Sequence, residues 1–437
     1  MQVSSAALGV FSRLASAKGN KRLTGRALWI LAIQAFFVAM LALPTTFQLQ
    51  RGVALALLTG IAATLSFRVW RVHREIVFLW LATIVVGVFG ITWGVSNGAP
   101  GALRVSTVYV IWPSVYLLFI GLAHDLTIMR RLETALLFGI TLATVMALIV
   151  LTAGLLGFGN VVHPFFAFQG AGFGAYEGYV EFRIFNLTTV MYGFPFVLSL
   201  ILVYRRELRG IRKFGIYLLL FAIVVVSLGS GRRAFWLVML LTPFILLPFL
   251  QLSSCRLQVV PFFSLIMKST VIAAVLIAGG IAAMGLDVIA LADQFSAAFA
   301  GQEASSSARY IQAVSLWQSF TESPLVGHGL GSAVDVQRSS NMPWAYELTY
   351  LALLMNVGSI GFSIYLVAIA WVAIKGVLAS RKNVEFARLF VPLITALCVF
   401  LIITATNPYL GKFDYLWVIF LPVALLNAYL TKRLKYD

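Results

Sequence analysis

The sequence has few charged residues, and this scarcity excludes a soluble protein. Only 11% of the 437 residues are Asp, Glu, Lys or Arg, whereas an ordinary soluble domain carries roughly a quarter. Hydrophobic residues make up 61% of the chain. They gather into runs of about 20 residues, each long enough to cross a hydrocarbon layer about 30 Å thick. We therefore expect an all-α integral membrane protein with about 12 transmembrane helices.

Cysteine and histidine are also rare, which limits disulfide and metal chemistry. The two cysteines, Cys255 and Cys398, lie far apart in apolar surroundings, and we expect small buried hydrophobes rather than a disulfide. The 4 histidines show no metal-ligand spacing. Neither a Ser/His/Asp arrangement nor a phosphate-cradling GK[ST] motif is present. We expect no metal and no cofactor.

Acidic residues are outnumbered by basic ones, 15 to 32, which gives a formal net charge of +17. The expected spans place about 24 of the Lys and Arg on one side of the membrane and about eight on the other. This positive-inside asymmetry predicts that both termini are cytoplasmic. A nucleic-acid partner is not expected, because no solvated domain carries a basic patch.

The chain is expected to form a single polytopic domain over residues 1–437. Residues 1–26 are basic and rich in Ser and Ala, and without the apolar core of a secretory signal they are expected to be a cytoplasmic tail. The spans leave two long outer loops, 157–186 and 287–345. The second loop follows a ninth span at about 259–286.

Among the basic residues expected on the outer side, four arginines at three sites stand out, because outward placement runs against the positive-inside bias. Arg183 lies at the outer end of the sixth span, Arg232 and Arg233 form the hairpin between the seventh and eighth, and Arg309 lies early in the second loop. Guanidinium groups keep their charge and bind phosphate oxygens in bidentate fashion. These arginines therefore favour an anionic partner, for which a lipid-linked diphosphate is the candidate; the alternative is that they anchor lipid headgroups.

Glu347 is the candidate general base, because it lies at the mouth of the tenth span, expected at about Tyr346 to Ile374. The alternative is that it caps this helix. His328 lies in the sequence Gly-His-Gly-Leu-Gly, whose glycines suggest backbone approach to a ligand. The alternative for His328 is a plain loop residue, since no strand precedes the glycines as in a dinucleotide site.

These residues resemble a pattern found in the O-antigen polymerase and O-antigen ligase superfamily of bacterial membrane glycosyltransferases. The family pattern runs from an Arg and a Trp through a Pro-x-x-Gly-x-Gly-x-Gly turn to a His or Glu and a Tyr-Leu at a helix start. Its counterparts here are Arg309, Trp317, Pro324 to Gly331 with His328, Glu347, and Tyr350-Leu351, with Gly358 and Gly361 closing the pattern. The family's Ser-Arg-Gly element is similar to Ser230-Gly231-Arg232-Arg233, and an Arg near an Asn is matched by Arg183 and Asn186.

The resemblance implies a GT-C-like bundle with a large periplasmic loop between helices 9 and 10. It implies a metal-independent glycosyltransferase of the bacterial inner membrane, with its active site facing the periplasm. Glycan would move from undecaprenyl diphosphate to an acceptor hydroxyl on a glycan or on a lipid-linked glycan. Arg232 or Arg233, Arg309 and Arg183 would hold the diphosphate, Glu347 would deprotonate the acceptor, and His328 and Tyr350 would be accessory residues. Membrane lipids and a chain-length regulator protein would be further partners.

Glu347 favours a polymerase of O-antigen or exopolysaccharide repeat units, because family ligases carry His there whereas many polymerases carry Glu. The Asn that usually follows is Leu348 here. An O-antigen ligase acting on lipid A-core is the alternative. A transporter or flippase of lipid-linked sugars is the alternative from another class. Such proteins usually show repeated halves or broken helices near the midplane, and the sequence shows no repeat.

Overall fold

The computed structural model describes residues 25–176, 179–255, 304–337 and 340–433. It is 78% helical, and 8 helices within these ranges are long and apolar enough to cross a membrane. The expectation of an all-α membrane protein is thereby confirmed. The ninth span expected at about 259–286 lies outside the described residues, so twelve spans and the GT-C fold stay predictions.

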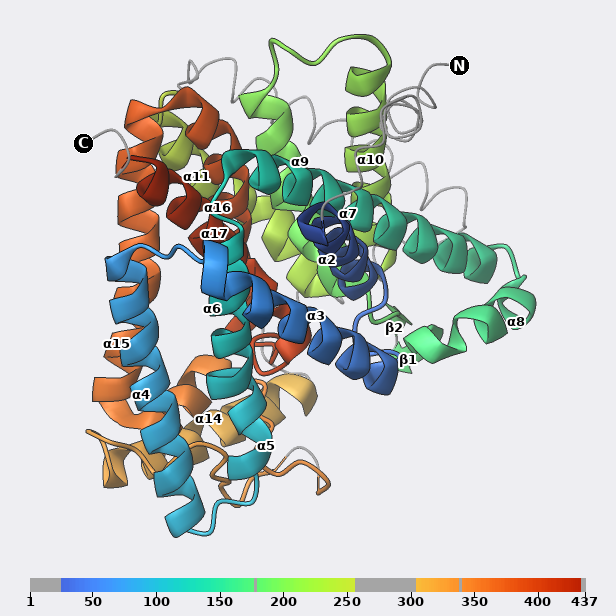
Figure 1. Cartoon of the computed structure of the whole chain (residues 1–437). Coiled ribbons are helices and arrows are strands. Elements are labelled where there is room, and N and C mark those ends of the chain that lie inside the picture. Colours follow the sequence, from blue (N-terminus) through green and yellow to red (C-terminus); the bar gives the residue numbers. More distant parts are fainter. Residues whose placement is uncertain (1–24, 177–178, 256–303, 338–339, 434–437) are drawn as a thin grey trace.

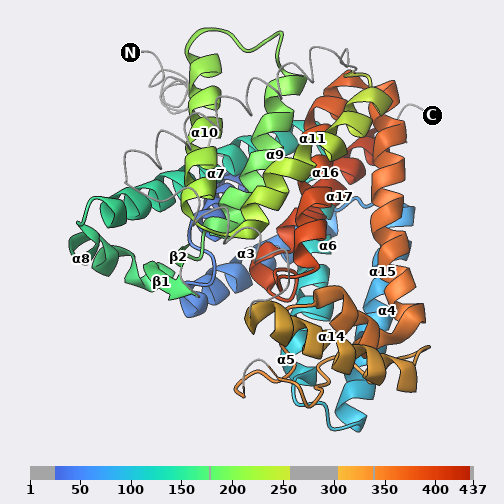
Figure 2. The same cartoon turned by 180° about the vertical axis from the view of Figure 1, so that it is seen from behind.

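Helices of very different length follow one another along the chain (Figures 1 and 2). The first half contains α2 (Gly25–Ala42), α3 (Gln48–Val69), α4 (Arg74–Ser96), α5 (Ala102–Ser106), a π-helix (Thr107–Ile111), α6 (Trp112–Leu122), α7 (Leu126–Leu155), α8 (Gly159–Val162), a 3₁₀ helix (His163–Gln169) and strands β1 (Gly172–Tyr176) and β2 (Tyr179–Arg183). The second half contains α9 (Leu187–Val203), α10 (Gly210–Gly229), α11 (Arg233–Leu252), α14 (Ala304–Glu322), α15 (Thr349–Lys382), α16 (Val384–Thr404), a 3₁₀ helix (Phe413–Tyr415) and α17 (Trp417–Arg433).

The loop expected at 157–186 contains a β-hairpin, the one sheet in the described ranges. Strands β1 and β2 pair antiparallel, with Gly172 opposite Arg183 and Tyr176 opposite Tyr179. Antiparallel pairing joins the two strands through backbone hydrogen bonds. The hairpin therefore gives Arg183, the last residue of β2, a fixed backbone position.

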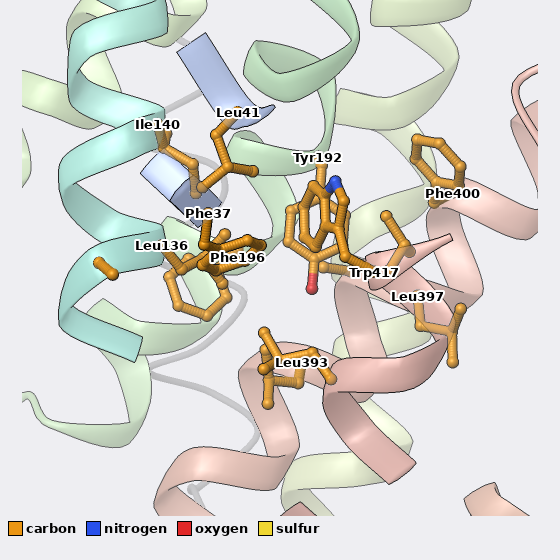
Figure 3. Packing of buried hydrophobic residues seen from close by; sticks show 14 of the residues in the cluster. Phe37, Leu41, Leu136, Ile140, Tyr192, Phe196, Leu393, Leu397, Phe400 and Trp417 are labelled. Atoms are coloured by element: carbon orange, nitrogen blue, oxygen red, sulfur yellow. The ribbon is translucent and has the colours of Figure 1, made fainter. Parts of the chain in front are cut away.

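The core lies around α9 and α16. Every residue of α9 from Leu187 to Leu202 is buried, as expected for a helix that is apolar on all sides and surrounded by other helices. Tyr192 of α9 meets the Trp417 ring edge-on, with centroids 4.7 Å apart, and Figure 3 shows this pair between Phe37 and Phe400. Side chains of α2, α7, α16 and α17 thus close on α9 from several directions.

Helix α15 is broken at Gly358, whose φ of 64° and ψ of −176° are not helical. In an apolar environment each backbone group freed by such a break needs a partner. Residues 324–331 supply these partners, because the Ser359 and Ile360 amides donate to Pro324 and Leu325 at 2.8 and 3.2 Å. The break therefore attaches the outer loop to α15.

Helix α14 lies across α4 and α15 in both views (Figures 1 and 2). The red turn between α16 and α17 lies between α14 and the β1–β2 hairpin in both views. The outer loop, this turn and the hairpin thus occupy one side of the molecule, which is the side that the charge distribution predicts to be periplasmic.

The packing of the glycine loop predicts that Gly329→Ala is strongly destabilising. Gly329 has a φ of +98°, and a Cβ there would lie 2.2 Å from the Gly94 amide nitrogen. Gly98 is a matched control, because its φ is +71° but nothing lies within 4 Å of a built Cβ. Left-handed backbone costs Ala about 1 to 2 kcal/mol at either site. We expect Gly329→Ala to lower the free energy of unfolding in detergent by at least about 2 kcal/mol more than Gly98→Ala; equal losses would contradict the packing of this loop against α4.

Candidate functional site

Arg309 and Glu347 form an ion pair on the side of the bundle that the charge distribution predicts to be outside. The Arg309 Nε donates to the Glu347 Oε2 at 2.6 Å. Arg309 comes from α14, and Glu347 precedes α15. The Glu347 side chain is 15% exposed and that of Arg309 36%, so the pair is shielded but reachable. The structure thus brings together two residues that the sequence placed 38 positions apart.

Glu347 is not the N-cap residue of α15, the position that a capping role would require. Helix α15 begins at Thr349 rather than at about Tyr346, and its N-cap is Leu348, which makes no side-chain cap hydrogen bond. The carboxylate bonds to Arg309 instead. The ion pair with Arg309 helps to fix the orientation of Glu347.

A small apolar cluster holds α14 against the start of α15. Leu316 of α14 is buried against Tyr346, Ala352 and Met355. The Tyr346 hydroxyl accepts a hydrogen bond from the Val334 amide at 2.6 Å, so the loop between the two helices is tied to the same cluster. This packing sets the distance between the backbones that carry Arg309 and Glu347.

The glycines around His328 approach protein backbone, which corrects their interpretation as a ligand cradle. The His328 and Gly329 amides donate to Met355 and Asn356 of the broken α15 at 3.0 and 2.8 Å. A Cβ on Gly331 would lie 2.3 Å from the Ala102 nitrogen. Each glycine leaves room for a neighbouring segment of the chain, so the loop packs against α4, α5 and the break in α15.

The two accessory candidates act as anchors in this structure. The His328 Nε2 lies 2.7 Å from the Ser319 carbonyl and 3.9 Å from the Glu322 carboxylate, which ties the glycine loop to α14. The Tyr350 hydroxyl donates to the Leu401 carbonyl of α16. Both side chains therefore support the frame around Glu347.

A second cluster of charged residues, Arg183, Arg232 and Arg233, forms where the β-hairpin meets the turn between α10 and α11. The Phe182 amide of β2 donates to the Ser230 carbonyl at 3.2 Å, and the Arg232 amide bonds to the Ser230 hydroxyl at 3.3 Å. Arg232 is the N-cap of α11 and Arg233 its first residue. The structure thus places Arg183 beside the hairpin that carries Arg232 and Arg233.

Asn186, by contrast, is buried away from this cluster. Its side chain is fully enclosed, and its amide lies 3.4 Å from the Ala42 carbonyl and 3.9 Å from the Met146 sulfur. These contacts join the start of α9 to α2 and α7. Asn186 therefore holds helices together and does not join the arginines.

The turn between α16 and α17 joins the second cluster to the Arg309–Glu347 pair. The Tyr415 hydroxyl donates to the Phe185 carbonyl at 3.4 Å, two residues after Arg183. The Thr349 hydroxyl donates to the Asn407 carbonyl at 3.2 Å, two residues after Glu347. Residues 405–415 therefore form a bridge between the second cluster and the Arg309–Glu347 pair.

A buried ion pair that the sequence did not reveal fixes this bridge. Arg51 of α3 pairs with Asp414, and their side chains are only 10% and 2% exposed. Arg51 also donates to the Leu43 carbonyl at 2.9 Å. Phe413 stacks on Trp112 with ring centroids 5.0 Å apart. The available signal was one basic residue in the turn at 48–51 and one acid in the turn at 407–414, each followed by an apolar run.

The assembled groups favour binding of an anion beside one carboxylate. Cationic side chains come from β2, from the α10–α11 turn and from α14, and Glu347 supplies an acceptor for a proton. Within the described residues no three His, Cys, Asp or Glu side chains come together as a metal site. The chemistry that these side chains support is therefore charge stabilisation and proton transfer.

The buried pair predicts a large stability loss for Asp414→Asn. Removing one partner leaves the other charge buried and uncompensated, which costs about 3–5 kcal/mol. Unfolding in detergent should show this loss. The double variant Arg51→Met/Asp414→Leu should lose much less, because it removes both charges together. A loss below about 1 kcal/mol for Asp414→Asn would contradict a bridge held by this pair.

No protein-family model matches the chain, and neither a curated protein nor a solved structure does. The resemblance to the O-antigen superfamily therefore rests on the sequence motifs alone, and no family is assigned.

Proposed function

We propose that the protein is a glycosyltransferase that polymerises lipid-linked oligosaccharide repeat units at the outer face of the membrane. The observation that carries the proposal is the Arg309–Glu347 ion pair, in which a part-exposed guanidinium on α14 meets a part-exposed carboxylate just before α15. Ionisable groups of a membrane protein are costly to keep and mark functional sites. The arginines of the second cluster support the same proposal.

In the proposed reaction, Glu347 takes the proton of an acceptor hydroxyl. The acceptor oxygen then attacks the anomeric carbon of the donor sugar, and the bond from that carbon to the diphosphate oxygen breaks. Undecaprenyl diphosphate leaves with the bonding electrons, and its negative charge is stabilised by arginines. The lengthened glycan stays on the other lipid carrier.

Arg309 suits both parts of this reaction. Its bond to Glu347 uses Nε, and a guanidinium has five N–H donors, so its terminal nitrogens can bind phosphate oxygens while the pair is intact. The guanidinium also stabilises the charged carboxylate, which is the form that a general base needs. Arg183 and Arg232 or Arg233 would hold the remaining phosphate oxygens.

The break in α15 is the observation that favours a transporter, since broken helices line substrate sites in many transporters. Here the freed groups bond to residues 324–331, so protein rather than substrate fills the break. We therefore prefer the enzyme and keep the transporter as an outcome of the test. A ligase acting on lipid A-core is the other outcome.

Glu347→Gln should lower the rate of polymer formation by about 10²–10⁴-fold, because a general base contributes a factor of this size. Asp335→Asn is the matched control, since it removes an exposed carboxylate from the same outer segment and should leave the rate unchanged. The charge-swapped variant Arg309→Glu/Glu347→Arg tests a purely structural role. It should regain stability but not activity; a rate of polymer formation close to wild type in either Glu347→Gln or the swapped variant would contradict the assignment.

The reaction itself is tested by incubating the purified protein with undecaprenyl-diphosphate-linked repeat units, with and without lipid A-core. A polymerase gives a ladder of products without the core. A single product that requires the core would identify a ligase instead. Movement of the repeat unit across a vesicle membrane without covalent change would identify a transporter.

A further inference from the structure

Lys412 lies on the bridge between the two clusters and was not singled out by its sequence. It is the N-cap of the 3₁₀ helix Phe413–Tyr415, and its amide donates to the Tyr409 carbonyl at 3.1 Å. The same turn contacts the backbone next to Arg183 on one side and Thr349 on the other. Its backbone position is therefore well fixed.

The charges around Lys412 are compensated by one another. Arg51 pairs with Asp414, and Arg309 with Glu347. The Lys412 ammonium, in contrast, makes no ion pair or hydrogen bond with any residue in the described ranges, and its side chain is exposed. The bridge thus presents one positive charge that its own ion pair does not neutralise.

The surroundings of Lys412 favour an anionic neighbour. Burial among the surrounding protein atoms lowers the pKa of Lys412, and the charge of Asp414 opposes this effect. An anion bound beside this accessible ammonium would favour its charged form. An ammonium also binds phosphate as a compact point charge without a fixed fork geometry. This suits a lysine on the bridge between the second cluster and the Arg309–Glu347 pair.

We propose that Lys412 is a positioning residue that contacts a phosphate group between the second cluster and the Arg309–Glu347 pair. The identity of this phosphate as the donor's diphosphate rests on the proposed function. A phosphate from a phospholipid headgroup has the same chemistry, so the experiment must separate the two sources.

The test is binding of undecaprenyl diphosphate to the full-length protein in phosphatidylcholine nanodiscs, repeated with phosphatidylglycerol added. Lys412→Ala should weaken this binding about tenfold, which corresponds to about 1.4 kcal/mol, and Lys412→Arg should retain most of it. Lys213→Ala is the matched control, because Lys213 is an exposed lysine at the start of α10. Its removal should leave binding unchanged.

The pH dependence supplies a readout that a structural role would not change. Wild-type binding should weaken at alkaline pH as Lys412 loses its proton, at a lower pH than an ordinary lysine because its pKa is lowered. Asp414 is the charged group that acts on Lys412; Arg51 of α3 pairs with Asp414, and the Tyr409 carbonyl accepts from the Lys412 amide. Lys412→Arg keeps all three and should abolish the alkaline loss, because arginine stays charged.

Unchanged binding by Lys412→Ala would overturn the inference, as would equal losses in Lys412→Ala and Lys412→Arg. If added phosphatidylglycerol makes wild type and Lys412→Ala bind undecaprenyl diphosphate equally, Lys412 binds lipid headgroups instead. This result would also overturn the inference. If Lys412→Ala weakens binding but no glycan transfer is found with wild-type protein, the inference stands and the polymerase proposal fails.

Discussion

Backbone groups freed inside an apolar bundle must find partners within the protein, and the break in α15 makes this requirement acute. At Gly358 the helix cannot satisfy its own amides and carbonyls, and residues 324–331 fill the gap with four backbone hydrogen bonds from or to Pro324, Leu325, His328 and Gly329. The same loop packs against the end of α4 and the start of α5. The positions of α14 and Glu347 follow from this loop, because it connects them.

A buried ion pair fixes the bridge at 405–415, the part of the site that the loop at 324–331 does not position. The bridge between α16 and α17 lies against three separate parts of the chain, and the buried Arg51–Asp414 pair ties it to α3. An ion pair at this depth is strongly unfavourable if one partner is lost. We infer that it contributes a defined position for the bridge more than it contributes net stability. Lys412 and the start of α15 are positioned through it.

Much of the helical layout could be predicted from the sequence, because apolar runs of spanning length and basic clusters are local signals. The start of α15 was misplaced by a few residues, since Glu347 and Leu348 belong to the preceding loop. The glycines near His328 were misread, because a glycine needed for a close approach looks the same whether ligand or backbone comes near. The β-hairpin lacked a clear alternating pattern in a stretch rich in Gly and aromatic residues.

The candidate site divides in the same way. Arg309 and Glu347 were singled out by their charge and by their position in the polar segment before the tenth span, and the structure pairs them. The Arg51–Asp414 pair joins residues 363 positions apart, and no local pattern encodes a contact of that separation. Lys412 was not identified for the same reason. In the sequence it resembles a solvated lysine in an outer turn, and only the fold places its turn between the second cluster and the Arg309–Glu347 pair.

A cryo-EM structure with undecaprenyl diphosphate bound is the most direct test of an outer-face site built from these separate segments. The diphosphate is expected between the Arg183–Arg232–Arg233 cluster and the Arg309–Glu347 pair, with Lys412 within hydrogen-bond distance of a phosphate oxygen. A diphosphate bound at Arg205, Arg206 and Arg209, the basic residues in the turn between α9 and α10, or inside the break of α15 at Gly358, would contradict this site.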